Sequence, residues 1–473
     1  MRARRFLGVT VMPEYIQTEG VGRVLDNLVG KAGVTAVATS PYVMAEADAK
    51  TGSREPPIDA GAGAVRLLDR PLWGKRELFV ATAPSFQPDS SLYRGLRYQP
   101  PPATELTRAQ RRIIHDFLAA AQARHLKVYL QVQAAIPPGY RVQFGGPVED
   151  DQPRLPDGRV PPRRLDRNGS LASPHIRAYG NALLRDLCRA YPDIDGIRVD
   201  WPEYPPYLLD SVFLDFGEHA RRAAIRLGFD FEQMRSAAAD LYRVLHGGLK
   251  DGDLAAWTEP DGGRYRLLRA LANRPGLTDL LRFKAVLVEE LLAEFRRTLA
   301  EAGGPRLELM PNAFPPPFTL ASGFDFTRAA RHSSAISVKL YTMHWPMMLK
   351  FYGEQILRAN PGLSERTLVR ALVRWMDIAD DDGLDTLAAY SYPEPEAPHP
   401  VGARAQARKI REGQRDAGSV PVYSLAHGYG PLEDFRTRLR TAWEASPHGL
   451  WINRYGYLSD RKLEAVGEVC GRV

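Results

Sequence analysis

The chain has 473 residues, of which 44% are hydrophobic and 25% are charged, so it can form a large core and carries too little charge to remain disordered. Its formal net charge of +7 is spread along the sequence, and its densest basic clusters, at 2–5 and 159–167, contain no aromatic residues. These features argue against a nucleic-acid-binding protein. No apolar stretch approaches the roughly 18 residues that a membrane span requires.

The first expected element is a buried strand at 6–12. The apolar run there is too short for a secretory signal, and Pro13 and Glu14 follow it where a signal would have small residues. Two cysteines, Cys188 and Cys470, cannot build a disulfide framework, so a reducing cytoplasm is the expected location. A helix is expected next, ending at Gly33.

Strands and helices then alternate along the chain. Runs rich in Val, Ile, Leu and Tyr have the length of strands, and segments with helical apolar spacing separate most of them, among them 107–125 and 176–191. The expected strands are 6–12, 35–40, 127–135, 196–201, 306–312, 335–345, 420–428 and 449–458.

This alternation predicts an α/β fold with parallel strands and right-handed crossovers. Eight units are the number that closes a (β/α)8 TIM barrel. An open, doubly wound sheet is the alternative, but such a sheet normally has a Gly-rich turn after its first strand, and the turn here reads MPEYIQTEGVG.

A minimal barrel needs about 250 residues, so the surplus is expected in insertions. Three segments that follow strand ends stand out, at 45–104, 136–172 and 202–304. No repeat and no shift in composition indicates an independent unit, so a single barrel domain over 1–473 is expected.

The segment YPDIDGIRVDWPEYPPY around the fourth strand is the most informative one. Side chains alternate in a strand, so Arg198 and Asp200 share one face. Strands of parallel barrels are usually apolar on both faces, and a charged pair there needs a reason. One reason is a buried ion pair that closes the barrel; the other is a catalytic site at its mouth.

The residues Asp195 to Asp200 resemble the fourth-strand motif of the alpha-amylase family, which implies that Asp200 is the nucleophile and that Arg198 orients it. The segment is also similar to the family 18 chitinase motif, from which it departs because Arg198 replaces an Asp and Glu203 comes one residue late. A third resemblance is to bacterial hypothetical glycosyl hydrolases. Together these resemblances imply a barrel enzyme of the glycoside hydrolase superfamily that acts on a carbohydrate.

Glycoside hydrolysis needs one carboxylic acid to protonate the leaving oxygen and one carboxylate as nucleophile, base or electrostatic partner. Asp200 and Glu203 supply such a pair from one strand end. A nearby Trp201 or Trp345 would raise one pKa by desolvation, and Arg198 would keep the other carboxyl ionised. We therefore expect Asp200, Glu203 and Arg198 to be catalytic, with both acids open to the barrel mouth.

Polar residues at other strand ends are expected to bind the sugar. Each one alone has an ordinary explanation as a cap or a satisfied core group, but together they would lie at one end of the barrel. The expected substrate-binding residues are Glu14, Gln131, Gln133, Trp201, Asn312, Lys339, Tyr341, His344, Trp345, His427 and Asn453.

Two of these expectations have qualifications. Tyr341 resembles the sixth-strand tyrosine of the chitinases, which orients a substrate amide, but Thr342 stands where those enzymes have an Asp. Glu14 and Glu259 are alternative second carboxylates, although each is also typical of a solvated surface residue.

Other classes of function stay open. A desolvated Lys339 in the barrel mouth suits a Schiff-base aldolase or lyase. A carbohydrate-binding barrel without turnover also fits, because a fold never proves chemistry. No metal or other cofactor is expected, since the ten histidines form no His-x-His or His-Glu-x-x-His motif. The expected partner is a carbohydrate substrate, without nucleic acid or membrane, and the oligomeric state is left open.

Overall fold

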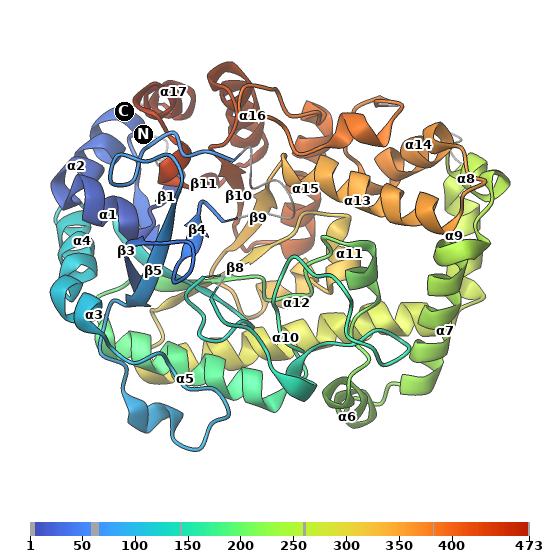
Figure 1. Cartoon of the computed structure of the whole chain (residues 1–473), viewed down its shortest axis with the longest axis horizontal. Helices are drawn as coiled ribbons and strands as arrows, with labels where there is room; N and C mark the ends of the chain where they lie inside the picture. The colour runs from blue at the N-terminus through green and yellow to red at the C-terminus, as the bar shows by residue number, and fades with distance from the viewer. Residues whose placement is uncertain (1–4, 58–65, 142–143, 259–261, 382, 472–473) are drawn as a thin grey trace.

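The computed structural model describes residues 5–57, 66–141, 144–258, 262–381 and 383–471. Eight parallel strands close into a barrel in the order β1-β11-β10-β9-β8-β7-β6-β2, and helices surround them (Figure 1). The predicted (β/α)8 TIM barrel is therefore confirmed. The barrel strands are β1 (Phe6–Thr10), β2 (Ala36–Thr39), β6 (Lys127–Gln133), β7 (Gly196–Asp200), β8 (Glu308–Ala313), β9 (Ile336–Leu340), β10 (Val422–His427) and β11 (Gly449–Asn453).

Helices occupy the intervals between the strands. The 29-residue α10 packs against α5 and α7, and together with α5 it flanks the lower part of the barrel in Figure 1. The α-helices are α1 (Pro13–Glu19), α2 (Val21–Asp26), α3 (Glu105–Gln110), α4 (Ile113–Gln122), α5 (Pro174–Ala190), α6 (Glu218–Arg226), α7 (Phe231–Arg243), α8 (Asp251–Thr258), α9 (Gly262–Ala272), α10 (Pro275–Gly303), α11 (Phe318–Ser322), α12 (Phe326–Ala330), α13 (His344–Ala359), α14 (Glu365–Met376), α15 (Ala403–Ala417), α16 (Leu432–Ala445) and α17 (Asp460–Cys470).

The inside of the barrel is filled by large side chains. The indole of Trp451 on β11 is fully buried, and Tyr129 on β6 meets it edge-on with ring centroids 5.4 Å apart. Gly8 on β1 makes room for this indole, because a Cβ there would lie 2.3 Å from a ring carbon. The barrel is thus a packed core whose polar groups gather at its carboxyl end.

The first insertion contains more regular structure than expected. Residues 45–104 were predicted only as a Pro-, Gly- and charge-rich insertion. A three-stranded antiparallel sheet lies there instead, in the order β3-β5-β4, with β3 (Tyr42–Ala47), β4 (Ser53–Glu55) and β5 (Leu78–Pro84). The strands are short and their apolar alternation is weak, so their pairing depends on contacts with the barrel that sequence periodicity does not reveal.

Two predicted strands are too long. Strand β9 ends at Leu340 and α13 begins at His344, so Tyr341, His344 and Trp345 lie beyond the strand. Strand β11 ends at Asn453, and a 3-10 turn follows at Tyr455–Tyr457. The connection from β9 to β10, residues 341–421, is also long and holds α13, α14 and α15, a further excursion that the sequence did not suggest.

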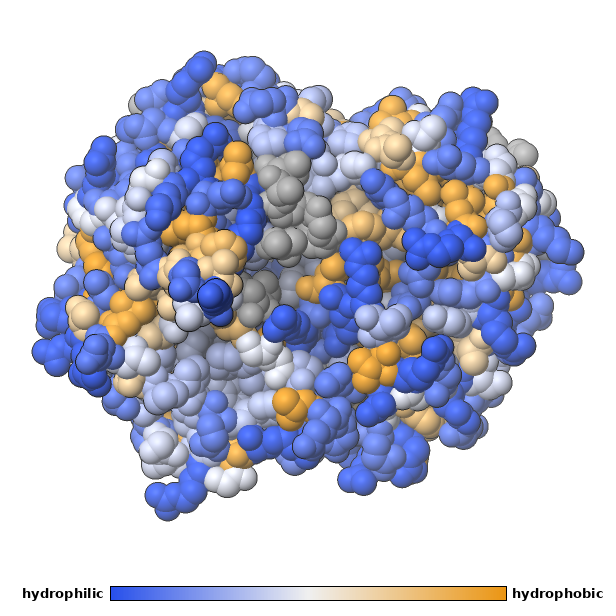
Figure 2. Space-filling view, in the orientation of Figure 1, coloured by the Kyte–Doolittle hydropathy of each residue, from blue (hydrophilic) through white to orange (hydrophobic). Residues whose placement is uncertain are grey.

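Hydrophilic side chains dominate the face seen in Figure 2, where apolar side chains form small separate groups and the centre is hollowed. The last helix, α17, lies at the same edge of the molecule as α2 (Figure 1). No helix among the described residues is long and apolar enough to cross a lipid bilayer.

Candidate active site

An ion pair occupies the carboxyl end of the barrel. It joins Asp200, the last residue of β7, to Lys339 of β9, with 2.6 Å between Asp200 Oδ1 and Lys339 Nζ. The Asp200 side chain is 11% exposed and that of Lys339 is 2% exposed, and the two atoms in contact, Asp200 Oδ1 and Lys339 Nζ, are both buried. Burial lowers the pKa of Lys339 from its ordinary value, and the charges of Asp200 and Glu203 oppose that effect.

Arg198 lies one layer below this pair and is fully buried. Its guanidinium donates to four neutral oxygens and covers the Trp451 ring, 3.8 Å from its centroid. Burial lowers the pKa of Arg198 to about 10. The hydrogen-bond acceptors are Thr10 Oγ1, Gln131 Oε1, Asn312 Oδ1 and Ser337 Oγ.

These contacts correct one expectation. Arg198 was expected to orient Asp200 directly, as the family resemblance implies. Its hydrogen bonds instead go to side chains of β1, β6, β8 and β9, and Lys339 is the cation in contact with Asp200. The physical reason is the alternation along β7, which places the two side chains on the same face but two residues apart, at different depths in the barrel.

Glu203 is buried behind Asp200 and does not open to the barrel mouth as expected. Its Oε1 accepts from the backbone N–H of Phe314 at 2.7 Å, and its Oε2 accepts from Ser322 Oγ at 2.5 Å. Burial raises the pKa of Glu203 to about 7, against the opposing charge of Lys339 and the two hydrogen bonds. The position of Glu203 depends on α11 and on the segment after β8, both far from it in the sequence.

Because the pKa of Glu203 is raised in the folded protein, we expect the free energy of unfolding to depend on pH. Between about pH 4.5 and 7 the folded chain holds a proton on Glu203 that the unfolded chain releases, so the stability that this proton provides is lost as the pH rises. The full contribution of this proton to the free energy of unfolding is about 3 kcal/mol. We expect the Glu203→Gln variant to lose this part of the pH dependence, measured as the difference in urea unfolding free energy between wild type and variant from pH 4.5 to 8. A constant difference across that range would contradict the raised pKa.

Aromatic rings and histidines surround the ion pair. Lys339 Nζ lies 4.9 Å from the Trp201 ring centroid and 5.3 Å from that of Phe314. The ring of Tyr207 contacts those of Trp201, Phe314 and His344, and Tyr341 lies between His344 and His427. Burial, followed by the charge of Arg66, lowers the pKa values of His344 and His427 well below the ordinary value, so both are neutral at pH 7.

Several polar atoms around the barrel mouth are buried and make no hydrogen bond to any described residue. They include Gln133 Oε1 at the end of β6, Trp201 Nε1 just after β7 and His427 Nε2 at the end of β10. Gln133, Asp200 and Asn312 also stand level with one another in the register of β6, β7 and β8. A ligand rich in hydroxyl groups would satisfy such atoms.

Glu14 belongs to a different group of charges. The interpretation of Glu14 as a solvated surface residue is wrong, since it is fully buried. Tyr42 donates to it at 3.1 Å, and Arg141 lies 3.3 Å from it and 2.6 Å from Glu55, which Arg454 also contacts at 2.6 Å. Burial raises the pKa of Glu14, whereas Arg141 and Arg454 outweigh burial and lower the pKa of Glu55. This network fastens the small sheet to the barrel.

The remaining predicted residues have the following positions. Gln131 and Asn312 bind Arg198 inside the barrel. Trp345 is buried in α13, where Lys409 of α15 lies 5.1 Å from its ring centroid, so its contact is with the helical layer. Asn453 ends β11 next to Arg454 of the charge network. Glu259 lies outside the described residues.

Sequence reasoning missed Ser322, which donates to Glu203, but it did indicate the segments that hold Tyr207 and Phe314 as a rigid, sugar-stacking rim. These aromatic, Pro-rich segments, 201–207 and 314–318, follow β7 and β8, and the alternative interpretation of them is ordinary turn scaffolding; in the structure the rings of Tyr207 and Phe314 contact each other. Ser322 gave no signal, because only the packing of α11 brings it to Glu203.

Comparisons with known proteins bear on the fold. No protein-family model and no curated protein sequence matches this chain. Among solved structures it is similar to the beta-galactosidase from the psychrophilic Marinomonas ef1, with 13% identity and a TM-score of 0.50; the alignment covers 98% of this chain and 58% of that one. The chain thus spans less than two thirds of that enzyme.

Two further solved structures are similar at lower TM-scores. The beta-galactosidase from Bacillus circulans sp. alkalophilus has 10% identity and a TM-score of 0.49, with 99% of this chain and 55% of that one covered. The catalytic domain of beta-amylase from Paenibacillus polymyxa has 11% identity and a TM-score of 0.47, with 97% and 94% covered. At such identities a similarity shows the fold alone, and this chain has a (β/α)8 barrel fold.

Proposed function

We propose that this chain is an enzyme that cleaves a glycosidic bond at the carboxyl end of its barrel. One observation carries the proposal: a partly exposed carboxylate, Asp200, lies among buried polar atoms that have no hydrogen-bond partner among the described residues. In TIM-barrel enzymes this end of the barrel holds the active site. Sugar hydroxyls both donate and accept hydrogen bonds, so a saccharide matches this mixture of donors and acceptors.

Asp200 is the proposed nucleophile or stabiliser of the positive charge that develops on the sugar ring. Lys339 holds its carboxylate in place through the 2.6 Å contact. Trp201, which precedes the Pro-rich segment, has a φ of +51°, a strained value for a bulky residue of the kind that clusters at functional sites. Its ring is the proposed stacking surface for a sugar.

Glu203 is the proposed general acid and base. A pKa of about 7 lets it carry a proton near neutral pH and still release it. Both of its oxygens accept hydrogen bonds from the protein in this structure. Proton transfer therefore requires that the bond from Ser322 Oγ be exchanged for one to the glycosidic oxygen.

The remaining proposed sugar ligands are polar groups at neighbouring strand ends. Gln133, Tyr341, His344 and His427 line the mouth near the ion pair. The two histidines are neutral at pH 7, so they would act as hydrogen-bonding groups and not as cations. Gln131 and Asn312 would support the site indirectly by holding Arg198.

A screen of nitrophenyl glycosides and oligosaccharides, with wild-type protein and the Asp200→Asn variant side by side, tests the proposal. We expect hydrolysis of at least one member of the panel by the wild type and its loss in the variant. Saccharide binding without any turnover would contradict the proposed activity and would favour a carbohydrate-binding barrel.

A Schiff-base lyase is the second candidate, and one observation favours it. Lys339 is buried at the barrel mouth and its pKa is lowered, as nucleophilic lysines require. The contact with Asp200 opposes this function, because it stabilises the charged ammonium. Borohydride reduction in the presence of aldehyde and keto-acid substrates distinguishes the two: mass spectrometry would find an adduct on Lys339 for a lyase, and we expect none.

A further inference from the structure

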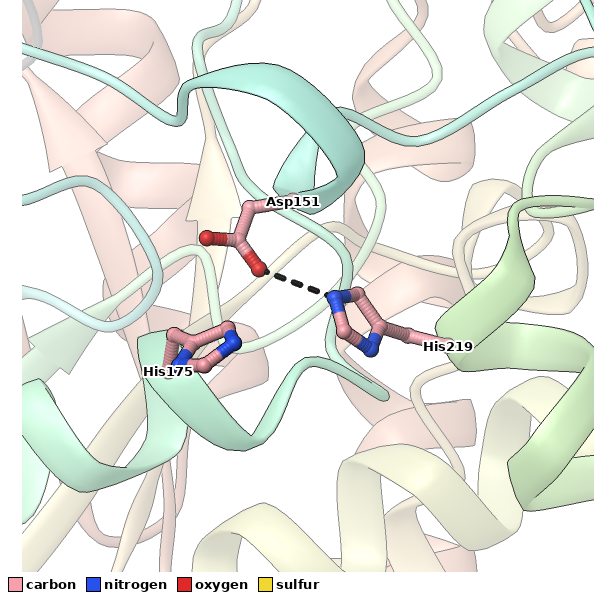
Figure 3. A group of neighbouring side chains, drawn as sticks. All are labelled: Asp151, His175 and His219. Atoms are coloured by element: carbon pink, nitrogen blue, oxygen red, sulfur yellow. Dashed lines mark ion pairs between the residues drawn. The ribbon is translucent and has the colours of Figure 1, made fainter. Parts of the chain in front are cut away.

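A second group of chemically active side chains lies outside the barrel. Asp151 is in a 3-10 turn (Glu149–Asp151) of the loop after β6, while His175 and His219 are in the first turns of α5 and α6. One ligand atom from each of the three lies within 4.8 Å of the others. Figure 3 shows the three side chains converging on the space between the loop and the two helix ends.

His219 faces two carboxylates at once. Its Nε2 lies 3.2 Å from Asp151 Oδ1 and 3.2 Å from Asp150 Oδ2. The residue is only 6% exposed, and Nε2 is a buried atom that makes no hydrogen bond of acceptable geometry to any described residue. In a tetrahedral site with metal–ligand bonds of about 2.0–2.2 Å, ligand atoms lie roughly 3.3 Å apart. The spacing between His219 and Asp151 is of that size, and the ligand atom of His175 lies within 4.8 Å of both.

The outer oxygens of both carboxylates are already held by other groups. Arg97 lies 2.5 Å from Asp150 Oδ1 and 2.8 Å from Asp151 Oδ2, and Tyr98 donates to Asp151 Oδ2 at 2.7 Å. Asp151 Oδ1 also accepts a hydrogen bond from Ser173 Oγ. Asp150 Oδ2 and Asp151 Oδ1 each lie 3.2 Å from His219 Nε2. Partners that hold the second oxygen of a carboxylate are typical of metal sites, where they orient the ligand.

We infer that Asp151, His175 and His219 form a binding site for a divalent transition-metal ion, with Zn²⁺ as the best match. Two imidazoles and one carboxylate suit Zn²⁺, whereas Mg²⁺ and Ca²⁺ prefer oxygen ligands alone. The two carboxylates and the single Arg97 leave one negative charge to attract the cation. This inference is independent of the proposed glycosidase activity.

The site would tie together three segments that are far apart in the sequence: the loop after β6, the barrel helix α5 and the inserted helix α6. Asp150 is 45% exposed, and a surface cavity of about 750 Å³ lined in part by Pro174, His219 and Arg222 adjoins the site, so an ion can reach it from solvent. The expected role of the ion is to hold this side of the molecule together.

Calorimetric titration of untagged, chelator-treated protein with ZnCl2 tests the inference. We expect one ion per chain, and at least tenfold weaker binding in each of the His175→Ala and His219→Ala variants. The matched control is His448→Ala, which removes an exposed histidine that does not belong to the cluster. This variant is expected to bind Zn²⁺ as the wild type does. Equal binding by all three variants, or no binding by the wild type, would overturn the site.

Two further measurements keep the test valid if a histidine variant does not fold. Arg97→Gln keeps all three ligands but removes the Arg97 contact that orients Asp151, so we expect 10- to 100-fold weaker Zn²⁺ binding from lost orientation. In the wild type, ZnCl2 is expected to raise the thermal unfolding midpoint and MgCl2 is not. An unchanged midpoint with ZnCl2, or an equal rise with both salts, would contradict the inference.

Discussion

The Asp200→Asn variant is expected to cleave its glycoside at least about 10²-fold more slowly than the wild type, which corresponds to about 2.7 kcal/mol of lost transition-state stabilisation. The amide keeps the size and hydrogen-bonding shape of the carboxylate but cannot attack a sugar carbon or neutralise a developing positive charge. The loss is expected in kcat more than in KM, since the interaction is made mainly in the transition state. Steady-state kinetics on the substrate found in the screen measures both.

The controls for Asp200→Asn address folding and nonspecific effects. Lys339 loses its counter-ion in this variant, and an unpaired buried charge destabilises a protein. Circular dichroism and a urea unfolding curve must therefore show that the variant is folded at the assay temperature. Asp157→Asn, at a surface residue paired with Arg159, is expected to keep wild-type activity. Near-full activity in folded Asp200→Asn protein would remove Asp200 from the mechanism.

The Glu203→Gln variant is expected to lose a similar factor, about 10²-fold, and to change the pH profile. A general acid acts in its protonated form, so wild-type activity should fall as the pH rises above about 7, where Glu203 ionises. Glutamine has no proton to donate at any pH, and its profile should lack this fall. The pH dependence of kcat/KM from pH 5 to 9 measures the effect.

A merely structural role for Glu203 gives a different result. Gln can still accept from the Phe314 N–H through its Oε1 and donate to Ser322 Oγ through its amide, so the loop after β8 would stay in place. If Glu203 only supports that loop, activity and pH profile will both stay close to those of the wild type. A substrate with a good leaving group, such as a dinitrophenyl glycoside, should restore part of the lost rate only if Glu203 is the acid.

The two variants together separate the candidate functions. A hydrolase loses activity in both, whereas a lyase that uses Lys339 would show the borohydride adduct and little dependence on Glu203. A carbohydrate-binding barrel would show binding in the wild type and no turnover in any variant. The stability measurement on Glu203→Gln is informative in every case, because it depends only on the burial of that carboxyl.

The sequence by itself determined the fold class, because strand and helix periodicities are local and each survives in a short window of residues. All eight barrel strands were found this way, and so was the charged strand around Arg198 and Asp200. Side-chain alternation also placed Lys339 toward the barrel interior, where it meets Asp200. These inferences needed only chain order and the pleat of a strand.

The tertiary structure alone decided which charges touch. Arg198 donates hydrogen bonds to Gln131 and Asn312 on the neighbouring strands and none to Asp200. The sequence of a single strand does not show how deep inside the closed barrel each of its side chains lies, so it could not predict these partners. Glu203 is covered by Ser322, and Asp151 meets His175 and His219, through the docking of helices whose positions depend on long-range packing. Local periodicity predicts elements, whereas the contacts between residues far apart in the chain arise only when those elements pack against one another.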